Sequence, residues 1–175
     1  MWAAAVLVGV AMTAVGNAPA AVPRSQMPEP VRVVIPAIRV DAPVVPLGLN
    51  RDRTMQVPRH LADAGWFRPG PEPGEVGPAV IVGHLNARSG PGVFSRLSQL
   101  RRGAVITVRL RNGTTVRFVA RSMLRVSKSR FPTKLVYART AKPTLRVITC
   151  AGELNPATGH HADNYIVFAT LARSA

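Results

Sequence analysis

The feature that most constrains the fold is the dipeptide Asn112-Gly113, which separates two β-type runs. The runs are Ala104 to Arg111 and Thr114 to Ala120, and both are rich in β-branched and apolar residues. Asparagine and glycine readily adopt the positive φ angles that a two-residue type I′ turn requires. The sequence therefore predicts an antiparallel β-hairpin over this segment.

The composition extends this prediction to the rest of the chain. The 175 residues include 16 prolines and 14 glycines, and aromatic residues make up only 5%. This favours a loop-rich β protein with aliphatic packing, and the length predicts one domain. Short β-type runs also occur at Val31–Ile35, Ala37–Val40 and Tyr165–Leu171. Short strands with frequent turns predict a closed or nearly closed β-barrel with one or two short helices.

Three further segments carry weaker local signals. Pro43 and Pro46 are expected to confine their segment to a sheet edge or a bulge, because proline cannot donate a ladder hydrogen bond. Leu61–Phe67 is expected to form one helical turn or a loop, with Trp66 as a packing anchor. Val93–Leu100 has apolar residues at helical spacing, which predicts a short helix or a helical turn.

The N-terminal region differs from the rest of the chain. Trp2 to Gly16 is apolar throughout, but its length of about 15 residues is short for a membrane span, which needs about 20. We assign residues 1–20 to a signal peptide or a short membrane anchor, residues 21–30 to a Pro-rich linker and residues 31–175 to the folded domain. The domain is expected to be exported and held outside a membrane.

The charge is strongly basic, with 23 Lys and Arg against 8 Asp and Glu and a formal net charge of +15. Nucleic acid, anionic lipid and acidic wall polymers are the partners that such a charge would suit. The basic residues are spread along the chain without a basic helix or an aromatic ladder, which argues against nucleic acid. The four histidines form no recognisable ligand pattern with the lone cysteine, so no metal or other cofactor is expected.

The single cysteine, Cys150, ends the alternating apolar segment that starts at Leu145. Two small residues and a turn-rich run follow it, so the thiol is expected at a strand end beside a loop. An isolated cysteine is more often a small buried residue without chemistry. However, a second apolar run, Ala79–Val82, ends at His84 after Gly83, where glycine is expected to relax the backbone. A thiol and an imidazole at two strand ends are the minimal parts of thiol catalysis.

Three blocks of the sequence resemble the sortases, most closely the actinobacterial class E and F branch. Together they cover about Val31 to Leu171, and they are specific as a set. The blocks are IPAIRVDAPVVPLGL, VGHLNARSGPGVFSRLSQLRRGAVITV and LRVITCAGELNPATGHHADNYIVFA.

The resemblance implies a mainly β, sortase-type eight-stranded β-barrel on the outer face of a Gram-positive membrane. It implies a monomeric cysteine transpeptidase, a peptidase of C-terminal sorting signals, that cuts an LPXTG-like signal between Thr and Gly. The new carboxyl end is then joined to an amine of the cell wall or the pilus. By the same resemblance, Cys150 is the nucleophile that forms the acyl-thioester and His84 is the acid and base.

The sequence departs from the family pattern at a third position. Sortases commonly place an arginine on the last strand, and the alignment brings Asn164 to that position. Asn164 is our site prediction, because an amide can donate hydrogen bonds to an oxyanion. Arg130 or Arg146 could supply the charge instead, and the tandem His160-His161 could replace His84 as the base.

Two other functions compete with this prediction. The first is a non-catalytic secreted β module that binds peptide or wall polymer, which the missing arginine favours. The second is an L,D-transpeptidase, whose signature has histidine and glycine before the cysteine and arginine after it. Here Ile148-Thr149 precede Cys150 and Ala151-Gly152 follow it, which argues strongly against the second function.

Overall fold

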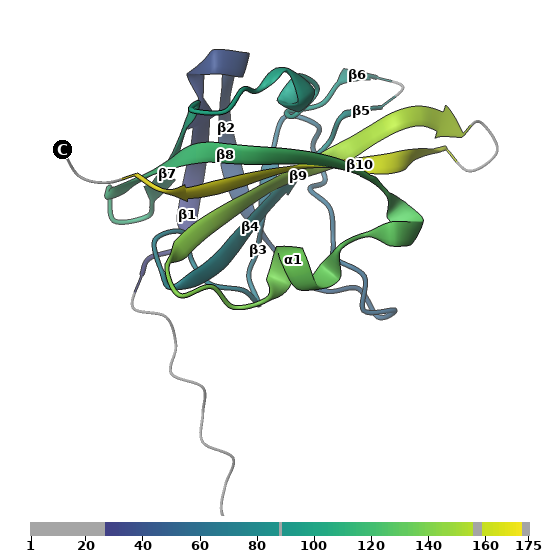
Figure 1. Cartoon of the computed structure of the whole chain (residues 1–175). Coiled ribbons are helices and arrows are strands. Elements are labelled where there is room, and N and C mark those ends of the chain that lie inside the picture. Colours follow the sequence, from purple (N-terminus) through teal and green to yellow (C-terminus); the bar gives the residue numbers. More distant parts are fainter. Residues whose placement is uncertain (1–26, 88, 156–158, 173–175) are drawn as a thin grey trace, which may run out of the picture.

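The computed structural model describes residues 27–172, apart from 88 and 156–158 (Figure 1). Its helices are one α-helix and three short 3-10 turns, so the described chain is mainly β. The elements in chain order are β1 (Pro30–Ile35), η1 (Pro36–Ile38), β2 (Val40–Leu47), β3 (Ala64–Phe67), β4 (Gly77–Gly83), β5 (Asn86–Ala87), β6 (Gly90–Pro91), η2 (Leu97–Gln99), β7 (Val105–Leu110), β8 (Thr115–Ser127), η3 (Lys128–Arg130), α1 (Thr133–Tyr137), β9 (Pro143–Asn155) and β10 (His160–Leu171).

Eight of these strands form a closed barrel in the order β1-β2-β3-β4-β9-β10-β8-β7, and β7 pairs with β1 to close it. Most neighbours are antiparallel, but β2 pairs with β3, and β4 with β9, in parallel. The remaining strands, β5 and β6, form a separate two-stranded sheet. The predicted eight-stranded barrel with few helices is therefore confirmed.

The predicted hairpin forms as β7 and β8, but its turn is not type I′. Gly113 has a φ of 86°, whereas Asn112 keeps a negative φ. The Gly113 amide donates to the Leu110 carbonyl at 2.9 Å, and the Leu110 amide donates to the Thr114 carbonyl at 2.8 Å. The connection is thus a three-residue loop that needs one left-handed residue, and glycine supplies it.

The expectation that Pro43 and Pro46 mark an edge or a bulge was wrong. Both prolines lie within β2, which has a neighbour on each side. Pro43 falls in the first half of the strand, which pairs with β1, and Pro46 in the second half, which pairs with β3. Because each half of β2 pairs on one side, neither missing N–H interrupts a fully occupied ladder.

The two segments for which a helical turn was considered have different structures. The segment containing Trp66 forms strand β3, and its indole is 1% exposed. Between Val93 and Leu100, the helical turn forms as the 3-10 turn η2, and no longer helix is present. Phe94 and Leu97 are fully buried there, so the apolar spacing reflects two anchors in the barrel core instead of a helix face.

The barrel sheet separates two hydrophobic cores, because side chains alternate between the faces of a strand. On β4, Ala79 and Ile81 join the larger, interior core, whereas Val80 joins a smaller core outside the barrel. That outer core includes Val136 of α1, which covers the sheet near β4 and β9 (Figure 1). The two-sided burial explains why the β4 run is continuously apolar.

Packed contacts begin a few residues before the predicted start of the domain at Val31. Met27 packs against the interior core, and Glu29 forms an ion pair with Arg111 at 2.9 Å. The predicted signal or anchor at residues 1–20 lies outside the described residues. Within the described ones, the helices are too short or too polar to cross a membrane.

Candidate active site

The parallel pairing of β4 with β9 determines where the candidate site forms. Val82 and Ile148 are partners in this register, and His84 and Cys150 each follow two residues later. The Thr149 hydroxyl donates to the Gly83 carbonyl at 2.8 Å and joins the two strands just before the site. Equivalent positions of two parallel neighbours lie side by side, so this register places the imidazole and the thiol at one level.

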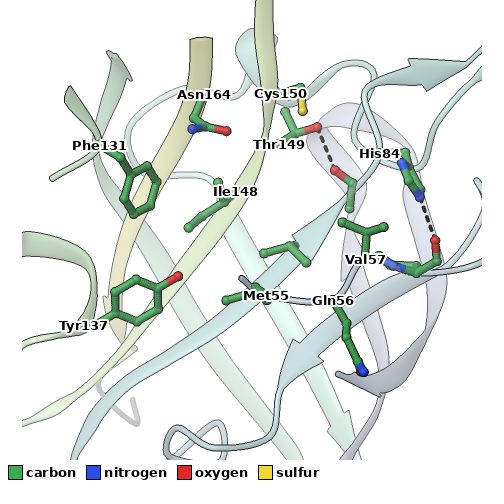
Figure 2. A pocket seen from close by; sticks show the side chains of 13 residues that line it. Met55, Gln56, Val57, His84, Phe131, Tyr137, Ile148, Thr149, Cys150 and Asn164 are labelled. Carbon is green, nitrogen blue, oxygen red and sulfur yellow. Dashed lines mark hydrogen bonds between the residues drawn. The ribbon is translucent and has the colours of Figure 1, made fainter. Parts of the chain in front are cut away.

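Asn164 joins them from the other side of β9. It lies directly opposite Cys150 in the antiparallel pairing of β9 with β10. All three predicted site residues line one cavity of about 190 Å³, and Figure 2 shows Cys150 between Asn164 and His84. The structure therefore brings the predicted residues together from three neighbouring strands.

The rest of this cavity is largely apolar, and several of its side chains belong to or border the outer core. Burial raises the pKa of the Tyr137 hydroxyl, which keeps it a neutral hydrogen-bond donor over the ordinary pH range. The wall residues besides the three site residues are Met55, Gln56, Val57, Pro58, Val82, Gly83, Phe131, Tyr137, Ile148 and Thr149 (Figure 2). We name this space the apolar cavity.

The His84 ring is held by a backbone carbonyl. Its Nε2 lies 2.7 Å from the Pro58 carbonyl oxygen, which can only accept a hydrogen bond, so Nε2 carries a proton. The other nitrogen, Nδ1, has no hydrogen-bond partner among the described residues and is the atom available for proton transfer. The backbone is fixed as well, because the Phe94 amide donates to the His84 carbonyl at 3.0 Å.

Gly83 allows the close packing of Phe94 and Val93 against the backbone before His84, and it does not relax that backbone. A Cβ placed on Gly83 would lie 2.5 Å from side-chain atoms of both Phe94 and Val93, so any larger residue would displace them. Its φ is not positive, and the expected conformational freedom is not used. The glycine is therefore required for a close approach that fixes the position of the next residue, His84.

Cys150 does not end its strand, as the sequence predicts, because β9 continues to Asn155. Instead the register shifts just after it, where Gly152 and Glu153 face the single residue Ala162. Gly152 has a φ of 80°, which is the left-handed conformation found in one class of β-bulge. The bulge changes the strand direction beside the thiol, which is half-buried and unpaired.

The arginines proposed as alternatives to Asn164 do not line the apolar cavity. Arg146 is 6% exposed and lies over the Phe168 ring, with its Cζ 4.8 Å from the ring centroid. Burial lowers the pKa of its guanidinium, and its Nε has no hydrogen-bond partner among the described residues. Arg130 is exposed at the end of η3. Neither lines the second cavity beside Cys150 either.

The arginine that does approach the site is Arg125 of β8, which sequence reasoning missed. It lines a second cavity, of about 260 Å³, that also includes Leu85, Cys150 and Gly152. Its Nε donates to Asp163 Oδ2 at 2.7 Å, and this ion pair packs against Gly152. Local pattern carries no signal for this placement, because it depends on the register between β8 and β10.

His161 is not placed as a free base. Its Nδ1 lies 2.8 Å from the Gly152 carbonyl oxygen, and its Nε2 lies 2.8 Å from Asn86 Oδ1. Both ring nitrogens are therefore engaged, unlike those of His84. The side chain of His160 lies outside the described part of the chain.

Comparison with known proteins gives one consistent family. The family model described as the sortase domain matches residues 33–172. No curated protein matches the chain. Among solved structures, a lid mutant of sortase A from Corynebacterium diphtheriae has a TM-score of 0.66 and 19% identity, and the match covers 87% of this chain and 74% of that one.

Two other solved structures show the same fold. Sortase C-1 from Actinomyces oris has a TM-score of 0.64 and 21% identity, with 82% of this chain and 72% of that one covered. Streptococcus pneumoniae sortase C has a TM-score of 0.63 and 18% identity, with 83% and 68% covered. The family model extends over both the His84 and the Cys150 strands, and the chain therefore belongs to the sortase family.

Proposed function

We propose that this sortase is a cysteine transpeptidase that cleaves an LPXTG-like sorting signal between Thr and Gly and transfers it to an amine. The acceptor is an amine of the cell wall or of a pilus subunit. The observation that supports this most is the alignment of His84, just after β4, with Cys150 on β9 and Asn164 on β10 beside one cavity.

In the first half of the proposed reaction, Nδ1 of His84 takes the proton of the Cys150 thiol, and the thiolate attacks the carbonyl carbon of the Thr residue. The negative charge that develops on the carbonyl oxygen is stabilised by a hydrogen bond from the Asn164 amide. The C–N bond to glycine then breaks, and His84, protonated at Nδ1, gives its proton to the departing amine. The products of this half are an acyl-thioester on Cys150 and a peptide that begins with glycine.

The second half reverses the proton transfer. An amine enters and attacks the thioester carbonyl, and Nδ1 of His84 takes a proton from it. The C–S bond breaks, the thiolate of Cys150 is restored and a new amide bond is formed. Water in place of the amine would give hydrolysis, so the same site supports a slower peptidase reaction.

The apolar cavity is the proposed site for the sorting peptide. Met55, Val57 and Ile148 give it an apolar wall that leads to the thiol, as Figure 2 shows. An extended peptide with apolar residues before its scissile bond would bury them there and place the Thr carbonyl near Cys150. Tyr137 offers a hydroxyl for the peptide backbone.

The proposed location is the cell envelope of a Gram-positive actinobacterium, outside the membrane, with a class E or F sortase as the proposed subgroup. The net charge of +15 would hold the domain near anionic wall polymers or lipid head groups. The solved structure of Streptococcus pneumoniae sortase C bears on pilin substrate specificity in that enzyme, which supports a pilin or wall acceptor here as well.

A non-catalytic binding module is the second candidate. It is favoured by one observation, that no arginine lines the apolar cavity within the described residues. Such a module would keep the barrel and the peptide cavity and would bind a sorting signal or wall polymer without forming the thioester.

The test is a transpeptidation assay on the intact chain with a library of LPXTG-type peptides and a series of amine acceptors. Mass spectrometry of the products should show cleavage after Thr and a new bond to the acceptor amine. Cys150→Ala and His84→Ala should abolish this product, whereas His60→Ala, which changes an exposed histidine, should not. Reversible peptide binding without any product would favour the binding module instead.

A further inference from the structure

We infer that His161 is a positioning residue that holds the segment carrying His84 against the segment carrying Cys150. The inference rests on the proposed transpeptidase function, because it assigns a role within that reaction. The same link is present in the free protein, so it can also be tested without any peptide substrate.

The geometry of this link is specific. His161 Nδ1 lies 2.8 Å from the carbonyl oxygen of Gly152, which follows Cys150 by two residues. His161 Nε2 lies 2.8 Å from Oδ1 of Asn86, which follows His84 by two residues. One imidazole ring on β10 therefore connects the chain just after the nucleophile with the chain just after the base.

This contact matters because few backbone hydrogen bonds of the described residues join the chain after His84 to the chain after Cys150 once the bond from Thr149 has been made. The pairing of β4 with β9 ends at Val82 and Ile148, and the Thr149 hydroxyl bond to Gly83 follows it. After that, Asn86 belongs to β5, which pairs with β6 in a separate small sheet. Leu85, Ala151 and Gly152 all line the cavity of about 260 Å³, so open space borders both segments. Beyond the Thr149 bond, His161 adds a side-chain link between the two segments.

The chemistry of the two contacts limits the protonation of the ring. A backbone carbonyl can only accept, so Nδ1 carries a proton and donates to Gly152. With Asn86 oriented as in the structure, Nε2 also faces an acceptor, and the ring then carries two protons. Turning the Asn86 amide by 180° would let its nitrogen donate to a neutral ring. Both arrangements keep the bridge. The charged groups beside it are Arg125 and Asp163, which pair with each other next to Gly152.

The expected effect of losing the bridge follows from the demands of the reaction. Proton transfer requires His84 and Cys150 to be placed correctly for the same substrate, and a misplacement of about 1 Å can cost about 100-fold in rate. The apolar cavity is lined by other residues, so peptide binding should change little. Loss of His161 should therefore lower kcat and leave KM nearly unchanged.

The experiment compares His161→Ala, Asn86→Ala and the double variant with the intact chain. Each single variant should lower kcat by about 10- to 100-fold, and the double variant should lose no more than the worse single one, because both remove the same link. Asn112→Ala is the control, since it removes a hydrogen bond of the β7–β8 turn far along the barrel sheet. It should lower the melting temperature without changing kcat.

A second readout separates this inference from the proposed function. The rate of Cys150 alkylation by iodoacetamide is measured against pH, which reports the thiolate and its coupling to His84 without a peptide. The profile should change in His161→Ala and Asn86→Ala in the same direction as in His84→Ala, and should stay unchanged in Asn112→Ala. An intact chain that turns over no peptide would contradict the proposed function alone, because the alkylation profiles would still test the bridge. Folded variants with the profile and kcat of the intact chain, or fully additive losses in the double variant, would overturn the role of His161.

Discussion

Asn164 is the residue that the resemblance to sortases aligns with an arginine of the family pattern. An arginine offers a charge and several donors, whereas an amide offers two donors without charge. Asn164 lies directly opposite Cys150 and lines the same cavity. Its position is therefore suited to stabilise an oxyanion formed by attack of the thiolate.

Replacing Asn164 tests this role. We expect Asn164→Ala to lower kcat by about 10²- to 10³-fold with little change in KM, because an oxyanion donor acts mainly in the transition state. Asn164→Asp keeps the shape but places a negative charge near the developing one, so its loss should be at least as large. Steady-state kinetics with one sorting peptide would measure both, and full activity in Asn164→Ala would assign the oxyanion donor to another group.

Arg146 is expected to be a structural residue. Its guanidinium is buried over Phe168 and its Nε is without a hydrogen-bond partner in the described part of the chain. Methionine has a similar length and no charge to desolvate. Arg146→Met should therefore lower the free energy of unfolding by no more than about 1 kcal/mol, and it should raise this free energy if the desolvation cost of the arginine dominates. Thermal melting and kcat would be measured together, and a large loss of kcat in a stable variant would show that Arg146 acts in the reaction.

At the scale of elements, the bulge in β9 shapes the chain beside the nucleophile. Gly152→Ala should strain the backbone, because the φ of Gly152 is 80°, and should also displace Asp163, because a Cβ would lie 2.8 Å from its Oδ2. Gly103→Ala is a matched control, since its φ is 89° but a Cβ would meet no atom within 4 Å. Each substitution should cost about 1–2 kcal/mol of stability from backbone strain.

Only Gly152→Ala should also lower transpeptidation, because it displaces Asp163 and the chain that follows Cys150. Chemical denaturation and product assays on both variants would check this. Equal activity in the two variants at matched stability would mean that the bulge does not control the site.

The elements that the sequence predicts well are those whose signals are local. The β7–β8 hairpin follows from two β-type runs and a turn between them, and only the turn type differed, because one left-handed glycine was sufficient. The β3 strand was missed because its pairing partners, β2 and β4, lie elsewhere in the chain. Local spacing at Phe94 and Leu97 resembled a helix because both residues point into the same core.

The candidate site shows the same division. The residue types and their flanking blocks predict His84, Cys150 and Asn164, and the structure places them together. The positions of Arg125 and His161 in the site depend on the pairing of β8 with β10 and on the contact between His161 and Asn86, which join segments far apart in the sequence and which no local pattern encodes. Position within the fold, and not residue type alone, distinguishes His161 from His84.

At the scale of the whole molecule, the barrel is stabilised by residues before the predicted start of the domain. A chain that begins at Val31 loses the packing of Met27 and the ion pair between Glu29 and Arg111. It also loses the backbone bond from the Arg111 amide to the Glu29 carbonyl. We expect it to be less stable than a chain that begins at Met27 by about 1–2 kcal/mol, from partial burial of a methionine and one exposed ion pair.

Chemical denaturation of the two chains would measure this difference. Because the site lies at the far edge of β4 and β9, both chains should have the same kcat when folded. Equal stabilities would show that residues 27–30 only cover the barrel without contributing to its folding.

The acyl-thioester that we propose between Cys150 and a sorting peptide can be detected by intact-protein mass spectrometry. The intact chain, Cys150→Ala and His84→Ala would each be mixed with an LPXTG-type peptide without an amine acceptor. The reactions would be quenched with acid, and the protein masses would be measured. We expect a mass increase on Cys150 equal to the peptide up to and including Thr, absent in Cys150→Ala and strongly reduced in His84→Ala. A chain that binds the peptide but never gains this mass would contradict the proposed thioester.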